Sequence, residues 1–453
     1  SINLITIKIR LVRIYSTDRW RKVKMEGDPL PKFRSNPVIE KLDSPEYHSI
    51  FTPELDTLAK LFEKYNYEIR IAGGAVRDIL MGIKPTDLDF ATTATPNEMK
   101  DMFTKEEIRM INMNGEKHGT ITSRINDAAN FEITTLRIDV VTDGRHAEVQ
   151  FTKDWRLDAN RRDLTINSMF LGLDGTVYDY FYGYDDLKKR RIAFVGNAET
   201  RIQEDYLRIL RYFRFYGRIA EEPDSHDEGT IEAIKNNVDG LGRIAGERIW
   251  SEWHKIIEGR FAADLIKKMI DCGLAPYIGL PENPNVEEFF RVYNRAKDNG
   301  IKLRPISLVS ALLEDQEEVM KLHARLKLSA FDRDLALFIV QHRGDKLSVN
   351  PLRPYQRLVL IPRGKVQGLK EFVCELLRYI GKVELLEEFT EWQPPRFPVN
   401  GDMLKAHVKP GKLLGTVMIK LKEEWLASDF QLTGEELLKL VPHILGELTD
   451  SAK

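Results

Sequence analysis

The chain has 453 residues, more than one hydrophobic core usually serves, so we expect two or more domains. Its 42% of hydrophobic and 30% of charged residues are typical of a soluble globular protein, and no apolar run is long enough for a membrane span. The formal net charge of -2 excludes a chain-wide cationic field for nucleic acid, so any RNA contact must depend on local patches. The isolated Cys272 and Cys374 argue against a disulfide framework and structural zinc.

The N-terminal segment before Met25 is basic, with Asp18 as its one acid, and its charges alternate with isoleucine and leucine. This pattern is similar to the end of a mitochondrial presequence; a disordered basic arm is the alternative. Met25 offers an internal start for a cytosolic form, so we expect mitochondrial and cytoplasmic or nuclear locations. Residues 26–50 are rich in proline and read as a linker.

Residues 68–195 alternate β-rich runs with short helical stretches, which predicts an α+β domain with a largely antiparallel sheet. The β-rich runs are 68–72, 87–91, 119–124, 131–136 and 147–151. Helical periods dominate from Ala198 to the end. The predicted fold class is therefore α+β, a head with a mostly antiparallel sheet followed by an all-helical neck, body and tail. The predicted parts are an arm and linker at 1–50, a head at 51–195, a neck at 196–261, a body at 262–370 and a tail at 371–453.

The segment Ile71–Leu80 reads as a strand, a double-glycine turn and a helix. Glycines such as Gly74 let the backbone approach a phosphate, and the new helix presents free N–H groups and its positive dipole end. Arg77 adds a fork-shaped donor for phosphate oxygens. On its own, such a turn is more often plain turn geometry.

Two carboxylates follow this turn on a predicted strand, Asp87 and Asp89. Strand alternation places both on one face, with Phe90 on the other. Side-by-side carboxylates repel unless a cation joins them, and their hard oxygens suit Mg²⁺ bound together with substrate phosphates. Glu132, on a later strand, is the candidate third carboxylate of a two-metal site; a surface glutamate is the alternative.

A second group of polar residues begins at Arg161–Asn167, where we expect a helix to start. Here Arg162 can hold a phosphate, and Asp163 can accept hydrogen bonds from ribose hydroxyls. A charged helix start with a capping role is the alternative.

Residues 204–215 predict one long amphipathic helix, with Asp205 and Arg208 on a shared face and Glu204 placed to orient Arg208. Arg208 and the next two arginines, Arg211 and Arg214, follow at intervals of three, where like charges repel unless an anion is present. Ordinary ion pairs along a helix are the alternative.

Asp205 and Arg208 also have a hydrogen-bond pattern that matches two bases. Cytosine and adenine both present an exocyclic amine beside a ring-nitrogen acceptor, whereas uracil and guanine present the reverse pattern. A carboxylate beside a guanidinium complements the first pattern, so one fixed pair can select C and A without a nucleic-acid template.

Together these motifs resemble those of class II tRNA nucleotidyltransferases, the CCA-adding enzymes of the polymerase β superfamily. The resemblance rests on GGAVRD with DLDF, on RRDLTIN and on EDYLRILRYFRF in this order, with further matches at 179–192, 246–252 and 398–404. It implies template-independent addition of C, C and A to the 3′ end of tRNA from CTP and ATP by two-metal transfer with Mg²⁺. It implies a tRNA-binding tail and a flexible loop at 139–145. The choice between a monomer and a homodimer stays open.

Carried over position by position, the resemblance implies roles for the candidate residues. The implied catalytic residues are Asp87, Asp89 and Glu132, with Asp87 and Asp89 as metal ligands. The implied nucleotide-binding residues are Gly74, Arg77, Arg162, Asp163, Asp205, Arg208, Arg211 and Arg214.

Three other functions fit parts of the pattern. A poly(A) polymerase shares the same head, but its typical Gly-Arg-Arg-Phe stretch is replaced here by residues 111–115. A non-catalytic RNA-binding scaffold is disfavoured by the intact Asp87 and Asp89. A metal-dependent phosphohydrolase would normally need histidine ligands, and His118 and His146 lack an HD pairing.

Overall fold

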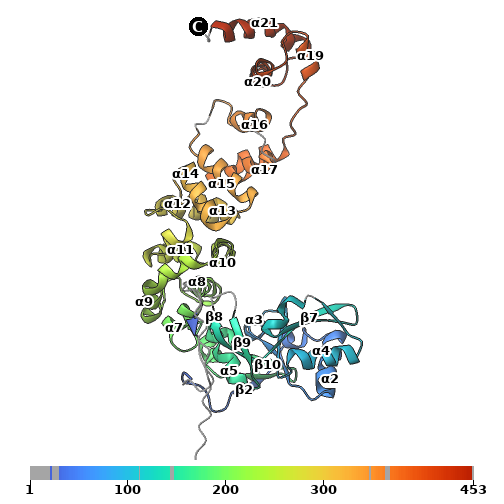
Figure 1. Ribbon diagram of the computed structural model, residues 1–453. Coiled ribbons are helices and arrows are strands. Elements are labelled where there is room, and N and C mark those ends of the chain that lie inside the picture. The colour runs from blue at the N-terminus through green and yellow to red at the C-terminus, as the bar shows by residue number, and fades with distance from the viewer. Residues whose placement is uncertain are drawn as a thin grey trace, which may run out of the picture. The chain divides into compact units, whose positions relative to one another are not determined.

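The computed structural model describes residues 21–22, 30–111, 113–142, 147–345, 348–362 and 368–450 (Figure 1). The chain divides into two compact units, one ending at Leu274 and one beginning at Ala275. Every described strand lies in the first unit, and helices make up the described part of the second. This confirms the predicted α+β head followed by helices; the finer division into neck, body and tail stays a prediction. Among the described helices, none has the length and apolar character to cross a membrane.

The main sheet of the first unit has eight strands in the order β2-β11-β10-β3-β4-β7-β6-β5. Its neighbours are antiparallel except β4 and β7, which run parallel, so the predicted largely antiparallel sheet is confirmed. A second sheet has the order β1-β8-β9. The strands are β1 Arg21–Lys22, β2 Val38–Lys41, β3 Ile69–Ala72, β4 Asp89–Thr92, β5 Arg109–Ile111, β6 Thr120–Ile125, β7 Ala129–Thr135, β8 Arg137–Thr142, β9 Ala147–Phe151, β10 Phe170–Gly172 and β11 Thr176–Tyr178.

The two faces of the central strands have different neighbours. On β4, Phe90 is 1% exposed and packs edge-on against Phe131, with ring centroids 5.5 Å apart. Alternation puts Asp89 and Ala91 on the opposite face. Ala91 joins an apolar cluster with Trp155, the first residue of helix α5 (Trp155–Asn160). The start of α5 therefore lies over the face from which Asp89 projects.

Helices and short 3-10 helices complete the first unit. They are α1 Pro45–His48, α2 Pro53–Lys64, α3 Gly74–Leu80, α4 Pro96–Lys105, η1 Met113–His118, α5, η2 Thr165–Asn167, α6 Gly183–Lys188, α7 Ala198–Glu204, α8 Arg208–Ile219, α9 Glu228–Asn237, η3 Val238–Arg243, α10 Gly246–Glu258 and α11 Ala262–Asp271. Two sequence predictions are wrong here. The single helix over 204–215 is interrupted between α7 and α8, and Arg161 ends a helix, as the C-cap of α5, instead of starting one.

The second unit is a series of helices with its own core. They are η4 Ala275–Ile278, α12 Val286–Asp298, α13 Pro305–Ser310, α14 Gln316–Leu326, α15 Ala330–His342, α16 Arg353–Leu360, α17 Leu369–Ile380, α18 Val383–Glu391, α19 Gly401–Lys405, α20 Lys412–Ala427 and α21 Gly434–Asp450. The buried Glu375 of α17 accepts hydrogen bonds from the Arg304 N–H (2.7 Å) and the Ser307 hydroxyl (2.8 Å) at the start of α13. A remote carboxylate thus caps a helix whose own N-cap residue makes no side-chain cap.

Candidate active site

A cavity of about 760 Å³ opens in the first unit between the central strands of the main sheet and helix α8. All of the candidate residues line its wall. They are Gly74, Arg77, Asp87, Asp89, Glu132, Arg162, Asp163, Asp205, Arg208, Arg211 and Arg214. The fold therefore brings together residues that are up to 140 positions apart, from Gly74 to Arg214 (214 − 74). Their individual roles remain predictions.

The three carboxylates lie at the edge where β4 begins. Asp87 comes just before β4, Asp89 is its first residue, and Asp89 is in parallel register with Glu132 of β7. Among the described residues, none of the three forms a salt bridge. Partial desolvation raises the pKa of Asp89, Arg162 opposes this, and the negative charge of Asp87 adds to it. Side-by-side carboxylates repel each other, and a bound cation relieves this repulsion.

The carboxylate pair could hold a divalent metal ion, because hard carboxylate oxygens are the ligands that such ions prefer. The described part of the chain has no group of three or more His, Cys, Asp or Glu side chains arranged to hold a metal ion. Mg²⁺ takes one or two protein carboxylates and completes its octahedron with substrate phosphates and water. Asp87 and Asp89 supply two such carboxylates in the wall of the cavity.

The predicted glycine turn joins β3 to α3. Gly73 has φ 68°, a left-handed conformation that favours glycine, and a Cβ there would come within 3.3 Å of Nη1 of Arg162. Arg77 is only 3% exposed: it donates to Oδ1 of Asn167 (2.5 Å) and to Asp78 (2.9 and 3.0 Å). Burial lowers the pKa of Arg77, with Asp78 opposing. Arg77 is thus held in the cavity wall, pre-oriented by two fixed acceptors.

Asp158 of α5, which the sequence analysis did not single out, is buried and binds two arginines of the cavity wall. Its Oδ1 accepts from Nε of Arg161 (3.1 Å) and the Arg137 N–H (3.1 Å), and its Oδ2 accepts from Nη2 of Arg162 (3.0 Å). Burial alone would raise the pKa of Asp158, but Arg161 and Arg162 outweigh it and lower the pKa to about 2. One buried carboxylate therefore fixes two cavity arginines.

The arginines of α8 are balanced by protein carboxylates. Nε of Arg211 donates to Oδ2 of Asp163 (2.5 Å), and Nη1 of Arg214 donates to both carboxylate oxygens of Glu252 (3.1 Å each). Burial opposes the negative form of Asp163, yet Arg211 lowers its pKa. Asp163 and Glu252 therefore offset part of the repulsion among these arginines, so a bound anion is not needed to balance all of their charge.

The bend between α7 and α8 carries the two candidate base-reading residues. Asp205 has an extended backbone (φ −152°, ψ 106°); its Oδ1 accepts from the Leu207 N–H (3.1 Å) and its Oδ2 from Nη2 of Arg248 (2.9 Å). These contacts favour a local turn over continued helix. Asp205 and Arg208 thus line one cavity without sharing a helix face, and the guanidinium bonded to Asp205 is that of Arg248.

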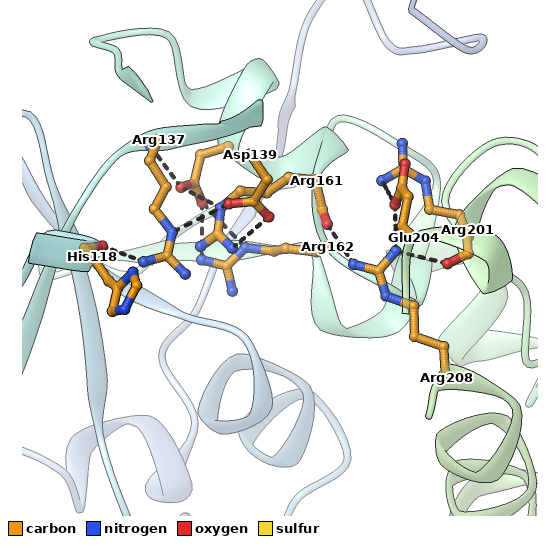
Figure 2. Close-up of polar contacts among 9 residues, drawn as sticks. His118, Arg137, Asp139, Arg161, Arg162, Arg201, Glu204 and Arg208 are labelled. Atoms are coloured by element: carbon orange, nitrogen blue, oxygen red, sulfur yellow. Dashed lines mark hydrogen bonds and ion pairs between the residues drawn. The ribbon is translucent and has the colours of Figure 1, made fainter. Parts of the chain in front are cut away.

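Arg208 is held by three acceptors (Figure 2). Its Nη1 donates to Oε2 of Glu204 (2.5 Å) and to the Arg201 carbonyl (3.0 Å), and its Nη2 donates to the Arg161 carbonyl (3.1 Å). The predicted orientation of Arg208 by Glu204 is confirmed. Glu204 also pairs with the buried Arg201 (2.9 Å), so a single carboxylate fixes both guanidiniums.

Sequence reasoning missed four arginines of the cavity wall: Arg137, Arg161, Arg218 and Arg248. Arg218 had a usable signal, since it continues the row of arginines on α8 by one more turn, and it donates to both oxygens of Asp78 (3.0 and 2.9 Å). The others follow from tertiary contacts alone. Arg137, for example, donates to the His118 carbonyl from the neighbouring segment.

The predicted flexible loop at 139–145 begins within a strand. Asp139 belongs to β8 and forms ion pairs with Arg137 (3.6 Å) and Arg161 (3.7 Å). Residues 143–146 lie outside the described part of the chain, as do 1–20 and 23–29 of the predicted presequence-like segment, Met25 included.

Comparisons with known proteins agree with this geometry. The model of the Poly A polymerase head domain matches residues 69–193, and that of a probable RNA and SrmB-binding site of polymerase A matches residues 226–283.

Human mitochondrial CCA tRNA nucleotidyltransferase 1 is 53% identical over 406 residues, 88% of this chain and 92% of that protein. The Bacillus stearothermophilus CCA-adding enzyme in complex with CTP has a TM-score of 0.63 at 22% identity, covering 90% of this chain and 100% of that one. A Thermotoga maritima CCA-adding enzyme complexed with tRNA has a TM-score of 0.62 at 21% identity, covering 95% and 100%. Identity above one half over most of both sequences shows that this chain belongs to the family of CCA tRNA nucleotidyltransferases.

Proposed function

We propose that this enzyme adds C, C and A to the 3′ end of tRNA without a template, using CTP and ATP and releasing pyrophosphate. The observation that carries the proposal is the single cavity in which two unpaired carboxylates, a glycine turn, a row of arginines and the Asp205–Arg208 bend face one another. The names of its relatives support the same activity, and the solved relatives with CTP and with tRNA support these partners.

In the proposed reaction, the 3′-hydroxyl oxygen of tRNA attacks the α-phosphorus of the nucleotide in line. The new P–O bond forms as the α–β phosphoanhydride breaks, and pyrophosphate leaves. Asp87 and Asp89 would hold Mg²⁺, with Glu132 beside them. Bound Mg²⁺ would supply activation of the hydroxyl and neutralisation of the leaving oxygens.

The remaining wall positions the nucleotide. Gly74 and the N-terminus of α3 face the phosphates, together with the guanidinium of Arg162, which Asp158 fixes. Arg211 and Arg214 extend this positive wall along α8 toward the triphosphate. Asp163 keeps lone pairs beyond its bond to Arg211 with which to accept from ribose hydroxyls.

Base choice would rest on the bend. Each carboxylate oxygen of Asp205 accepts one protein hydrogen bond and has a further lone pair for the amine of C or A. The three bonds that hold Arg208 use only part of its five N–H groups, so others can donate to the ring nitrogen. Because both side chains are anchored, the pattern they present is fixed, and U or G would leave polar groups unpaired.

The comparisons also bear on the alternative activity and on the subcellular location. A poly(A) polymerase of the same superfamily shares the head, but relatives over most of the chain are CCA-adding enzymes, so this alternative is not favoured. The vertebrate relatives are named as mitochondrial, and together with the basic N-terminus they support a mitochondrial location. A cytoplasmic or nuclear form starting at Met25 stays a prediction.

The test of the function is to sequence the products made from tRNA lacking CCA when all four nucleoside triphosphates and Mg²⁺ are present. The proposal expects addition of C, C and A followed by a stop, and no addition after Mg²⁺ is chelated. A long homopolymer of A would establish the poly(A) alternative, and no addition by the folded wild type would establish a binding scaffold.

A further inference from the structure

One aromatic ring connects the bend between α7 and α8 to the neighbouring helix η3 by packing. Tyr206 lies at the bend, directly between Asp205 and Leu207, and its ring packs on Gly240 of η3. A Cβ at Gly240 would lie 2.0 Å from Cδ1, 2.1 Å from Cε1 and 2.3 Å from Cγ of Tyr206. Gly240 is buried, and Tyr206 is partly buried.

At position 240, a side chain is excluded by the lack of space beside the Tyr206 ring, and the backbone conformation does not require glycine. It is not among the glycines with positive φ in the described part of the chain. An alanine could adopt its backbone, and the three atoms nearest to the added methyl all belong to the Tyr206 ring. Carbon atoms in contact keep about 3.5–4.0 Å apart, so the ring or η3 would have to move by roughly 1.5 Å.

The same short segment makes two further contacts with the bend. The Cζ of Arg243 lies 5.8 Å from the centroid of the Tyr206 ring, and Arg248 holds Oδ2 of Asp205 at 2.9 Å. Residues 240–248 therefore support both the ring and the carboxylate. Within the bend, the Arg208 N–H donates to the Asp205 carbonyl (2.9 Å), so a displacement of Tyr206 is passed to both neighbours.

We infer that Tyr206 and Gly240 are positioning residues for base choice: their contact sets where Asp205 and Arg208 stand. The inference rests on the proposed function, since it assigns meaning to the bend only if the bend reads the base. Neither residue lines the cavity in which we place the nucleotide. Hydrogen bonds to a base edge need the two side chains in place to a fraction of an ångström, and a shift of the size required by a methyl at Gly240 would break that pattern.

The experiment measures single-nucleotide addition by the full chain with CTP and with UTP separately, giving kcat and KM for each. Gly240→Ala is expected to lower the ratio of kcat/KM for CTP over UTP by at least about fivefold, because base-edge discrimination is lost. Gly229→Ala is the matched control: it lies on α9 in the same unit, and its added methyl meets Asp227 at an ordinary 3.4 Å. Its ratio should equal that of the wild type.

Tyr206→Ala tests whether the effect of Gly240→Ala acts through the Tyr206 ring. Alone it should also lower the ratio, since the bend loses its support, and adding Gly240→Ala to it should cause no further loss because the clash is gone. An equal effect of Gly240→Ala in both backgrounds, or a wild-type ratio in Gly240→Ala and Tyr206→Ala alike, overturns the inference. If Gly240→Ala does not fold, Tyr206→Ala decides by its own ratio.

A further variant distinguishes failure of the positioning role from failure of base reading by Asp205 and Arg208. The double variant Asp205→Asn with Arg208→Asp must change the CTP to UTP ratio if the pair reads bases. An unchanged ratio there refutes base reading by the bend itself. A changed ratio there, with wild-type values in the Tyr206 and Gly240 variants, refutes only the positioning role.

Discussion

The buried carboxylate of Asp158 offers the sharpest test of how the cavity is held together. It is 1% exposed and accepts hydrogen bonds from Arg161, Arg162 and the Arg137 N–H. Asp158→Asn keeps the shape and removes the charge. The guanidiniums of Arg161 and Arg162 then lose their shared partner at the wall where we expect the nucleotide phosphates to bind.

The expected loss of unfolding free energy follows from the pKa of Asp158, which falls from 3.8 to about 2 on folding. A lowered folded-state pKa stabilises the protein above the unfolded-state value, and at pH 7 the shift is worth about 2 kcal/mol of unfolding free energy. Arg161 keeps its ion pair with Asp139, but the loss of the pair between Arg162 and Asp158 adds to the destabilisation, up to about 3–5 kcal/mol. The stabilisation by Asp158 declines below pH 3.8 and is lost as the pH falls through about 2, so at pH 3 it is roughly half its neutral value.

The assay is urea unfolding at pH 7 and pH 3, followed by tryptophan fluorescence since Trp155 of α5 is buried. Asp154→Asn is the matched control, because Asp154 caps the same helix, forms only a half-exposed pair with Arg156 (3.1 Å), and asparagine caps equally well. Asp158→Asn should lose at least about 2 kcal/mol at pH 7, the control less than about 1 kcal/mol. The KM for CTP should rise about tenfold, equivalent to about 1.4 kcal/mol. A loss for Asp158→Asn no larger than for the control, or one independent of pH, refutes the reasoning.

Three further outcomes are expected. Asp89→Asn should leave less than about a tenth of wild-type turnover in Mg²⁺ while tRNA affinity by filter binding stays within a few-fold, since it removes a proposed metal ligand and no proposed RNA contact; high residual turnover argues against the metal site. A chain cut before Pro398 should raise the KM for tRNA far more than that for CTP, because the nucleotide cavity lies wholly in the first unit; equal losses would mean that the removed part only supports the fold. Glu375→Ala should destabilise the second unit by about 3 kcal/mol in urea unfolding, as it leaves the buried start of α13 uncapped, while Glu375→Gln should lose less; equal losses for the two variants would show that the cap is unimportant.

The sequence was most informative where local pattern and chemistry coincide. Polar residues flanked by buried ones predicted the strands of Asp89 and Glu132, and these strands pair in parallel with the two residues in register. The double-glycine turn before α3 is present, with Gly73 in the left-handed region. Short strands such as β10 and β11 were missed because three residues carry too little alternation to detect.

Tertiary contacts account for the errors. Helical periodicity continues through Asp205, but Arg248, 43 positions later (248 − 205), holds its carboxylate and the bend forms. Asp158 looked like an ordinary helix residue, since only the fold brings Arg137 and Arg162 to it. The charges of the arginine row on α8 are met by Glu252 of another helix, which no local pattern could show.

The central claim is that a protein side-chain pair, and no nucleic acid, chooses the bases. The direct test is single-nucleotide addition to tRNA lacking CCA by the wild type and by Asp205→Asn with Arg208→Asp, with each nucleoside triphosphate supplied alone. The double variant presents a donor and an acceptor in the reverse order, so use of UTP relative to CTP should rise by roughly one to two orders of magnitude, given about 1–3 kcal/mol for a good base-edge pair. The overall rate should fall, because Glu204 loses Arg208 as a partner and keeps only Arg201. A parallel decline of CTP and UTP use, with their ratio unchanged, would contradict the account and show that the bases are read elsewhere.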